Sequence, residues 1–206
     1  MPETIKQRNS GDSVTTTEAP AASPVRYVID ARVSRFTIRV FASGMLSAFG
    51  HSPTIAVRDF AGEARLSPDA LDSASLHVTV QAASLAVTDN ISEKDRREIE
   101  REMQDNVLEI AKYPEIMYDC SRVSVNDSPS GQYAITLNGN LTLHGETHGQ
   151  AVPTRIAITG DMLRAFGEFS LRQSDYSIKL VSAIGGGLKV KDEVRFSFDI
   201  VARRQE

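Results

Sequence analysis

The sequence contains no tryptophan and a single cysteine, Cys120. One cysteine cannot form an intrachain disulfide, so the cysteine content does not point to an oxidising compartment. No apolar run approaches the roughly 20 residues that a membrane span needs, and residues 1–24 lack the apolar core of a secretory signal peptide. We therefore expect a cytoplasmic protein, or a periplasmic one if a signal has been removed from the chain.

Basic residues are slightly fewer than acidic residues. The chain has 23 Lys and Arg against 27 Asp and Glu, a formal net charge of −4. This balance argues against nucleic acid as the main partner. The sequence has no phosphate-binding loop, dinucleotide-binding fingerprint or Ser-His-Asp pattern, so it carries no signature of a common enzyme class.

The 206 residues fall into two regions of different composition. Residues 1–24 are rich in Ser, Thr, Pro, Ala and Glu and have almost nothing to bury, so we expect a disordered tail. The hydrophobic content rises from residue 25 onward to that of a globular domain. The segment 25–206 is long enough for one domain with a substantial core.

Most of this domain alternates between apolar and polar residues, which is the period of a β-strand with one buried face. "RFTIRVF" places Phe36, Ile38 and Val40 on one face, and "DEVRFSFDIVA" repeats the pattern near the C-terminus. About eight to ten strands follow at intervals typical of antiparallel sheets, since the short linkers leave little room for parallel crossovers. A sandwich and a closed barrel both fit. Further candidate strands are 116–125, 152–159, 163–172 and 177–180.

Two positions interrupt the alternation. Gly139, in the middle of "YAITLNGNLTL", indicates a bend, a bulge or the close approach of another group. The buried parity also changes after Val57, because Ile55 and Val57 share one face and Phe60 belongs to the other. One extra residue exchanges the two faces of a strand, so we expect a bulge near residues 58–59.

One segment, residues 92–110, has helical spacing instead. Its apolar residues are three or four positions apart from Ile99 to Ile110. Ser92 and Asp95 have the spacing of a capping box at the start of a helix. The apolar stripe is narrow, so the sequence predicts an amphipathic helix that lies over one patch of a larger structure.

Several stretches, taken in order, carry a family resemblance. They are "GHSPTIAVRDFAGEARLSPDALDSASLHVTVQAASL", "EKDRREIE", "LEIAKYPEIMYDCSRV", "YAITLNGNLTLHGETH", "GEFSLRQSDYSIKL" and "VKDEVRFSFDIVA". Together they extend from about Tyr27 to Arg203, and each is weak when taken alone. Their order and spacing resemble the YceI-like polyisoprenoid-binding proteins, many of which are periplasmic.

The resemblance implies a mainly β fold, an antiparallel lipocalin-like β-barrel of about eight strands with one amphipathic helix around residues 92–110. It implies a non-catalytic carrier that holds an isoprenoid quinone, a polyprenyl chain or another long amphiphilic lipid in an apolar lumen. No cofactor other than this lipid is expected. Members of a broad family need not share one ligand, so the fold does not fix the function.

Apolar residues of the inward parity are the candidates for the lumen wall. Burying a lipid chain stabilises a complex by about 0.8 kcal/mol per CH₂, so an apolar channel can bind without polar contacts. Small residues of the same parity, among them Ala64, Gly139, Ala165 and Gly167, would leave space unfilled. The alternative is that the same side chains fill a dry core. The predicted lining residues are Phe36, Ile38, Phe60, Val78, Val80, Tyr118, Ile135, Leu137, Leu141, Phe169, Ile178, Phe196 and Phe198.

Four polar residues are candidates for the barrel mouth or for contact with a ligand headgroup: His51, Arg172, Asp175 and Tyr176. His51 is bracketed by turn residues, and we interpret it as tying a strand entrance through a ring hydrogen bond. Contact with a headgroup is its functional alternative. In "RQSDYSIKL", a pair formed by Arg172 and Asp175 would close a barrel end or orient a headgroup.

His144 and His148, with Glu146 between them, raise the question of a metal site. On a helix this spacing would place both rings on one face, whereas on a strand and turn it does so only by chance. We therefore expect no metal here, and a turn marked by Gly145 and Gly149.

Two other functions stay open. An enzyme acting on a lipid-like substrate in the barrel would need His51, Tyr118, Cys120 or His144 to face the lumen. A stress-linked interaction protein would have a closed core and bind its partner through the outer surface or the tail. Exposed barrel edges or a mouth-to-mouth contact also leave a homodimer open.

Overall fold

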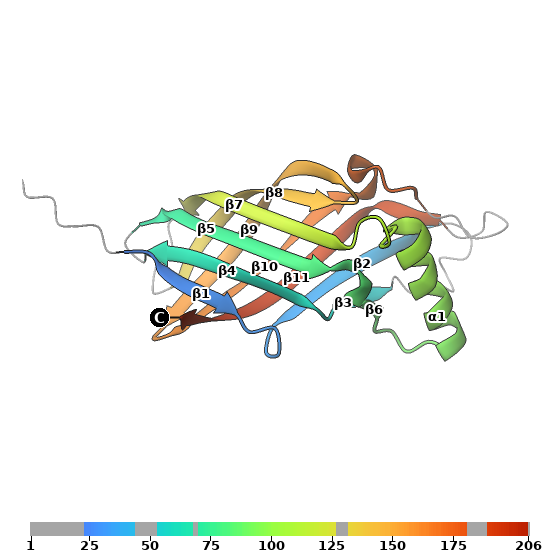
Figure 1. The fold of residues 1–206 in the computed structure, drawn as a ribbon, viewed down its shortest axis with the longest axis horizontal. Coiled ribbons are helices and arrows are strands. Elements are labelled where there is room, and N and C mark those ends of the chain that lie inside the picture. Colours follow the sequence, from blue (N-terminus) through green and yellow to red (C-terminus); the bar gives the residue numbers. More distant parts are fainter. Residues whose placement is uncertain (1–22, 44–52, 68–69, 127–131, 181–188, 206) are drawn as a thin grey trace, which may run out of the picture.

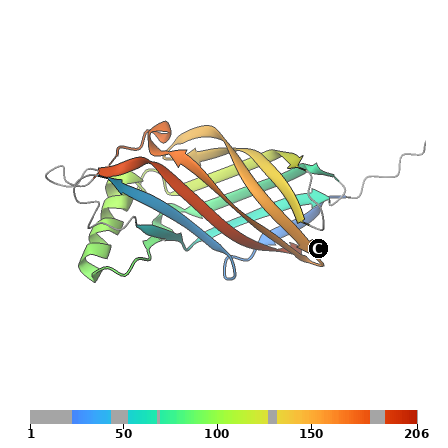
Figure 2. The same ribbon diagram turned by 180° about the vertical axis from the view of Figure 1, so that it is seen from behind.

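The computed structural model describes residues 23–43, 53–67, 70–126, 132–180 and 189–205. The strands in these ranges belong to one antiparallel sheet. It curls into an elongated barrel with the helix across one end (Figure 1). From behind, the same long strands slant around the barrel (Figure 2). The predicted mainly β, lipocalin-like barrel is confirmed, whereas His51 and nearly all of the expected tail lie outside the described residues.

Strands make up most of the described chain. They are β1 (Val25–Ile29), β2 (Arg35–Ser43), β3 (Thr54–Val57), β4 (Phe60–Ser67), β5 (Ala70–Gln81), β6 (Leu85–Val87), β7 (Glu115–Asn126), β8 (Gln132–Leu143), β9 (Glu146–Thr159), β10 (Met162–Arg172) and β11 (Lys189–Gln205). The helix α1 (Glu93–Glu102) lies between β6 and β7 and continues into a π-turn, Met103–Val107. A short 3-10 turn, Gln173–Tyr176, follows β10.

Eight of the strands close the barrel, in the order β1-β4-β5-β7-β8-β9-β10-β11 and back to β1. Each of their ladders between described residues is antiparallel. A barrel of about eight strands has an interior that side chains can fill or that can hold one small ligand.

The long strand β11 is shared between two neighbours. Its residues 202–205 pair with β1, and its residues between 189 and 199 pair with β2. β2 in turn pairs with β3, and β3 with β6. One end of the barrel is therefore closed by β1, and at the other end the wall is extended by β2, β3 and β6.

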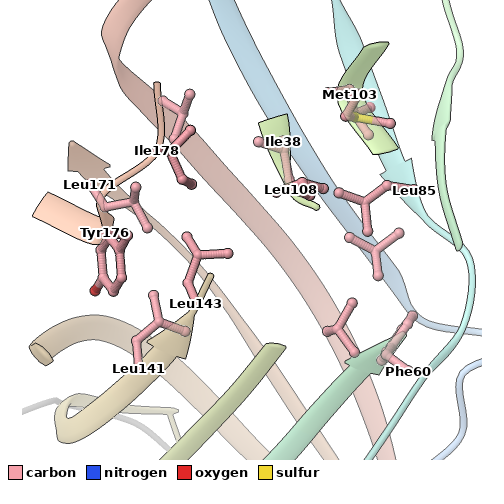
Figure 3. Packing of buried hydrophobic residues seen from close by; sticks show 14 residues of the cluster. Ile38, Phe60, Leu85, Met103, Leu108, Leu141, Leu143, Leu171, Tyr176 and Ile178 are labelled. Atoms are coloured by element: carbon pink, nitrogen blue, oxygen red, sulfur yellow. The ribbon is translucent and has the colours of Figure 1, made fainter. Parts of the chain in front are cut away.

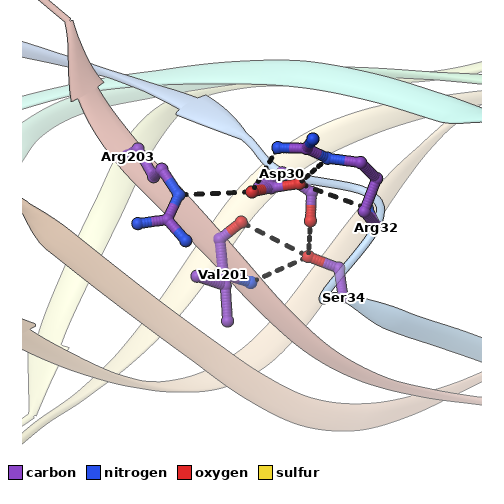
Figure 4. A network of polar contacts seen from close by, with 5 residues as sticks. All are labelled: Asp30, Arg32, Ser34, Val201 and Arg203. Atoms are coloured by element: carbon purple, nitrogen blue, oxygen red, sulfur yellow. Dashed lines mark hydrogen bonds and ion pairs between the residues drawn. The ribbon is translucent and has the colours of Figure 1, made fainter.

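A polar network fastens the turn after β1 to β11, where β11 changes partner (Figure 4). The Asp30 carboxylate accepts hydrogen bonds from Nε of Arg32 at 3.0 Å and from Nε of Arg203 at 3.2 Å. Ser34 Oγ donates to Asp30 O at 2.8 Å and accepts from Val201 N at 2.9 Å. The Arg32 and Arg203 guanidinium groups lower the pKa of Asp30 from 3.8 to about 2.

Alternation places the apolar side chains inside the barrel. On β5, Val78 and Val80 border the interior, whereas His77 and Thr79 lie on the outer surface. There His77 Nδ1 lies 2.6 Å from Asp119 Oδ1 on β7, and His77 Nε2 lies 3.1 Å from Thr79 Oγ1. On β5 the inner face is therefore apolar, while the outer face pairs polar side chains across strands.

Gly139 faces an irregular point in the neighbouring strand. The ladder between β7 and β8 shifts register between Cys120 and Arg122. A Cβ atom at Gly139 would lie 2.5 Å from the Asp119 backbone oxygen and 2.6 Å from Cζ of Tyr118. The glycine therefore leaves room for the Tyr118 ring, and of the three predicted alternatives the close approach of another group is present.

Two predictions of local structure are wrong. The expected bulge at residues 58–59 is instead a break, because β3 ends at Val57 in the wall extension and β4 begins at Phe60 in the closed ring. Residues 177–180 do not form a strand; Ser177 has a φ of 56° after the 3-10 turn, and the chain continues without regular structure. A left-handed residue at that point ends the helical turn and redirects the chain.

The helix begins as predicted, because Ser92 Oγ accepts a hydrogen bond from Asp95 N at 3.1 Å. It is regular only to Glu102, and none of its residues from Glu93 to Glu102 is buried. The apolar residues just beyond, Met103 and Leu108, are buried. The helix therefore owes little of its position to apolar burial of its own side chains.

Two side chains of α1 hold it against β6, the edge strand of the wall extension. Arg96 Nη1 donates to Val87 O, and Glu100 Oε1 accepts from Val87 N at 2.9 Å. The two residues are one turn apart, so one helix face meets both hydrogen-bonding groups of the same edge residue.

Buried side chains form two clusters at opposite ends of the barrel. The helix-end cluster includes Met103 and Leu108, which gather with side chains of the strands (Figure 3). The packed-end cluster lies near β1 and fills that end of the interior. Its members are Tyr27, Leu66, Leu71, Cys120, Val123, Ile135, Ile156, Leu163 and Ala202.

Candidate ligand cavity

A cavity of about 1020 Å³ occupies the interior between the two ends of the barrel. This volume is at the upper end of the roughly 300–1,000 Å³ typical of small-molecule sites. Residues of nearly every strand and of α1 border it, and most of them are apolar. The interior is therefore not closed by its own side chains in this structure.

Four phenylalanine rings from different strands meet along the cavity wall. Phe169 and Phe196 stack at a centroid distance of 4.7 Å and an interplanar angle of 8°. Phe36 lies 6.2 Å from Phe196 and meets Phe60 edge-on at 6.1 Å. The neighbours hold these rings in offset and edge-to-face contacts, which gives the cavity a rigid apolar surface.

The polar groups in the middle of the wall already have partners. Thr154 Oγ1 donates to Val152 O at 3.1 Å. The Tyr118 hydroxyl lies 3.0 Å from each of the backbone oxygens of Leu137 and Gln150, to one of which it donates. Burial raises the pKa of the Tyr118 hydroxyl, so it stays neutral. These polar groups therefore form their hydrogen bonds within the barrel, and the middle of the cavity wall presents an apolar surface to a ligand.

The charged side chains that border the cavity come from α1 and the loop before it, at the helix end. They are Asp89, Asp95, Glu98, Arg101 and Glu102. Ile99 and Met103 border the cavity from the same helical segment. An apolar interior therefore changes to a charged rim where the helix crosses the barrel.

The structure brings almost all the predicted lining residues together. Those that border the cavity are Phe36, Ile38, Phe60, Val78, Val80, Tyr118, Leu137, Leu141, Phe169, Ile178, Phe196 and Phe198. Ile135 does not. It lies on β8 in the packed-end cluster beside Val123 and Ile156, because residues on one face of a long strand reach different depths of the barrel.

The predicted mouth residues lie elsewhere. Arg172 and Asp175 are exposed, and Tyr176 is buried with its ring edge-on to His148 at 5.1 Å. None of these three borders the cavity, whereas their neighbour Gln173 does. The sequence indicated the right segment, but period-two counting does not apply within a 3-10 turn.

His144 forms the tight turn between β8 and β9, with φ values of 52° at His144 and 80° at Gly145. Its Nδ1 donates to Tyr176 O at 3.1 Å, its Nε2 lies 3.5 Å from Glu109 Oε1, and its ring lies 4.6 Å from the Tyr113 ring. The side chain ties the hairpin to two segments at the helix end. The predicted turn is confirmed at Gly145, whereas Gly149 lies within β9.

Sequence reasoning predicted Phe36 and Ile38 on β2 but missed Val40 there and the contribution of β3, β6 and the helical segment to the cavity wall. Val40, Ile55, Val57, Leu85 and Met103 all border the cavity. The alternation of Ile55 and Val57 was a usable signal. The position of Met103 had no such signal, because helical periodicity does not say what the helix covers.

The described candidates for catalysis do not form a reactive group. Cys120 is buried in the packed-end cluster, and its Sγ lies 3.3 Å from Arg122 O. Neither Cys120 nor His144 borders the cavity. Among the described residues, no group of three His, Cys, Asp or Glu side chains could hold a metal ion. None of the helices in the described part of the chain is long and apolar enough to cross a membrane.

The fold and the cavity define a class: antiparallel β-barrels that enclose an apolar chamber, with one end packed and the other crossed by a helix. The model of the YceI-like domain matches residues 27–202 of the chain. The protein therefore belongs to the YceI-like family. No curated protein sequence matches it.

Solved structures show the same fold at low sequence identity. BcnA of Burkholderia cenocepacia is similar with a TM-score of 0.63 and 17% identity, covering 84% of this chain and 98% of that chain. A polyisoprenoid-binding domain from Saccharophagus degradans gives 0.62 and 13%, covering 88% and 99%. The YceI protein of Campylobacter jejuni gives 0.53 and 14%, covering 74% and 85%.

Proposed function

We propose that this protein is a non-catalytic binding protein that holds the chain of an isoprenoid, or of another long amphiphilic lipid, inside the barrel. The observation that carries the proposal is the cavity of about 1020 Å³. Its phenylalanine-lined middle offers a guest no free hydrogen-bond donor among the described residues. Such a space favours a chain that needs no hydrogen bonds over a polar substrate.

The energetics support a long chain in particular. Each buried CH₂ contributes about 0.8 kcal/mol, so about ten of them contribute about 8 kcal/mol before the cost of association is subtracted. That cost alone is several kcal/mol, so short chains should bind weakly. The Saccharophagus degradans domain with the same fold is described as polyisoprenoid binding, which agrees with this interpretation.

A catalytic role has less support. The Tyr118 hydroxyl borders the cavity, but it donates to a backbone carbonyl, and burial raises its pKa away from the range of an effective acid or base. Cys120 and His144 lie off the cavity wall. Among the described candidates, none therefore forms an activated nucleophile or base beside the cavity, which supports a binding role over a catalytic one.

Native mass spectrometry of gently purified protein, followed by extraction of the bound material, tests the proposal. We expect an isoprenoid or fatty ligand, or uptake of added retinol with a rise in its fluorescence. Absence of bound lipid together with failure to take up retinol and farnesol would refute it.

A matched pair on β5 locates the site. Val78 borders the cavity, whereas the next residue, Thr79, lies on the outer surface. Val78→Asn places an amide without a partner on the cavity wall and should weaken retinol binding. Thr79→Asn should leave binding unchanged, and both proteins should keep the β-sheet circular dichroism spectrum.

A further inference from the structure

Negative charge predominates among the side chains at the helix end of the cavity. Four carboxylates border the cavity there, and we call them the acidic rim: Asp89, Asp95, Glu98 and Glu102. Arg101 is the one described basic side chain that borders the cavity. The rim adjoins Ile99 and Met103, so the carboxylates lie where the apolar wall ends. A lipid whose chain fills the apolar interior would have its headgroup at this level.

The neighbouring Arg96 and Arg97 form no ion pair with the acidic rim. Arg96 is engaged by backbone oxygens, donating to Val87 O and to Asp89 O at 2.9 Å. Arg97 pairs instead with Glu93, with Nε and Oε1 2.9 Å apart.

The rim carboxylates themselves bind neutral donors. Asp89 Oδ2 accepts from Thr54 N at 2.7 Å, and Glu102 Oε2 accepts from Asn106 Nδ2 at 2.6 Å. No ion pair links any rim carboxylate to a described cation.

A second polar group on the cavity wall has the same preference. Gln173 is only 9% exposed and borders the cavity. Its Nε2 donates to Lys191 O at 2.9 Å, and none of the described residues donates to its Oε1. The amide therefore offers the cavity an acceptor.

We propose that the acidic rim and Gln173 select the headgroup of the bound lipid. They favour a cationic or neutral group that donates hydrogen bonds, such as an ammonium or a hydroxyl, and disfavour a carboxylate or phosphate. This inference rests on the proposed function, because it assumes a lipid chain in the cavity. The physical basis is repulsion between like charges at the rim, which salt screens over about 10 Å at 0.1 M.

Three farnesyl compounds that differ only at the headgroup test the rule: farnesylamine, farnesol and farnesoic acid. Each displaces bound retinol from the full-length protein, and the loss of retinol fluorescence gives its affinity. At low salt we expect the order amine, alcohol, acid, with about tenfold or more between the amine and the acid. Added salt should narrow this difference and leave farnesol unchanged.

Two double variants with the same change in net charge separate the rim from the overall charge. Glu98→Gln with Glu102→Gln removes two rim carboxylates. Glu93→Gln with Asp105→Asn removes two acids of the same helical segment that do not border the cavity. The first variant should reduce the difference between farnesylamine and farnesoic acid severalfold, and the second should retain it. The β-sheet circular dichroism spectrum and the Tm of both variants verify that the barrel is intact.

Each outcome separates this inference from the function on which it rests. If farnesoic acid binds as tightly as farnesylamine, or if the control variant narrows the difference as much as the rim variant, the headgroup rule is wrong and lipid binding stands. If none of the farnesyl compounds and no retinol binds, the proposed function and the headgroup rule fail together.

Discussion

A bulky side chain at the deep end of the cavity should shorten the lipid that the barrel accepts. Ala165 on β10 borders the cavity and also packs against the packed-end cluster. It lies opposite Ile156 on β9 and Ile200 on β11. In Ala165→Phe, the ring would project into the space where the far end of a bound chain lies.

The size of the effect follows from the space that the ring takes. If the ring displaces about three or four methylenes, the complex loses about 3 kcal/mol at about 0.8 kcal/mol each. That loss is a reduction in affinity of about a hundredfold for a long chain. A chain too short to reach the deep end should bind as before. The ring enters existing space, so the loss of stability should be smaller than the roughly 1–3 kcal/mol of overpacking.

Displacement of retinol by saturated alcohols of increasing length measures this effect. The wild-type protein should gain affinity with each added methylene until the cavity is filled, and Ala165→Phe should stop gaining earlier. Ser170→Phe, at an exposed position on the same strand, is the matched control and should follow the wild type. A uniform loss for short and long alcohols, or an unchanged length limit, would refute the reasoning.

Three further predictions concern the barrel itself. Gly139→Ala should cost about 2–4 kcal/mol in urea unfolding, because its Cβ would lie 2.5 Å from a backbone oxygen, whereas Gly149→Ala, with nothing within 4 Å, should cost almost nothing; equal effects would contradict this. Asp30 should stabilise the fold above its ordinary pKa of 3.8 and lose that contribution as the pH falls towards about 2. Thermal melts of Asp30→Asn should therefore depend less on pH in this window, and an unchanged profile would argue against the network. Arg96→Ala should increase hydrogen exchange in α1 with little change in Tm, because no residue of α1 is buried; a large drop in Tm would show that the helix supports the barrel.

The face of each strand could be predicted from the sequence, but its depth in the barrel could not. Alternation correctly assigned Ile135 and Leu137 to the inner face of β8. It could not show that Leu137 borders the cavity while Ile135 lies in the packed-end cluster. Depth depends on strand register and tilt, which a single sequence does not encode locally.

The change of partner strand along β11 could likewise not be predicted from the local sequence. The parity change between Val57 and Phe60 was visible, but a bulge and a break between two strands leave the same signature in sequence. The structure has the break because β11 pairs first with β2 and later with β1. That choice depends on contacts between residues more than a hundred positions apart.

The helix was predicted from its spacing and its Ser92 cap, yet its part in the site was not. A surface helix usually carries charged residues, so the sequence could not distinguish Glu98 and Glu102 from ordinary solvent-exposed residues. Their position beside the cavity depends on Arg96 and Glu100 meeting Val87. Side-chain contacts with a backbone edge have no pattern of their own in a sequence.

The contact of Arg96 and Glu100 with Val87 also has a consequence for self-association. An unpaired edge strand is a template on which another chain can add a strand, and β6 is such an edge within the described sheet. The two side chains of α1 occupy the donor and acceptor of Val87 that an added strand would need. Any movement of the helix that widened access to the cavity would uncover this edge at the same time. If the barrel binds lipid as proposed, ligand loading and protection against aggregation would therefore depend on the same pair of side chains.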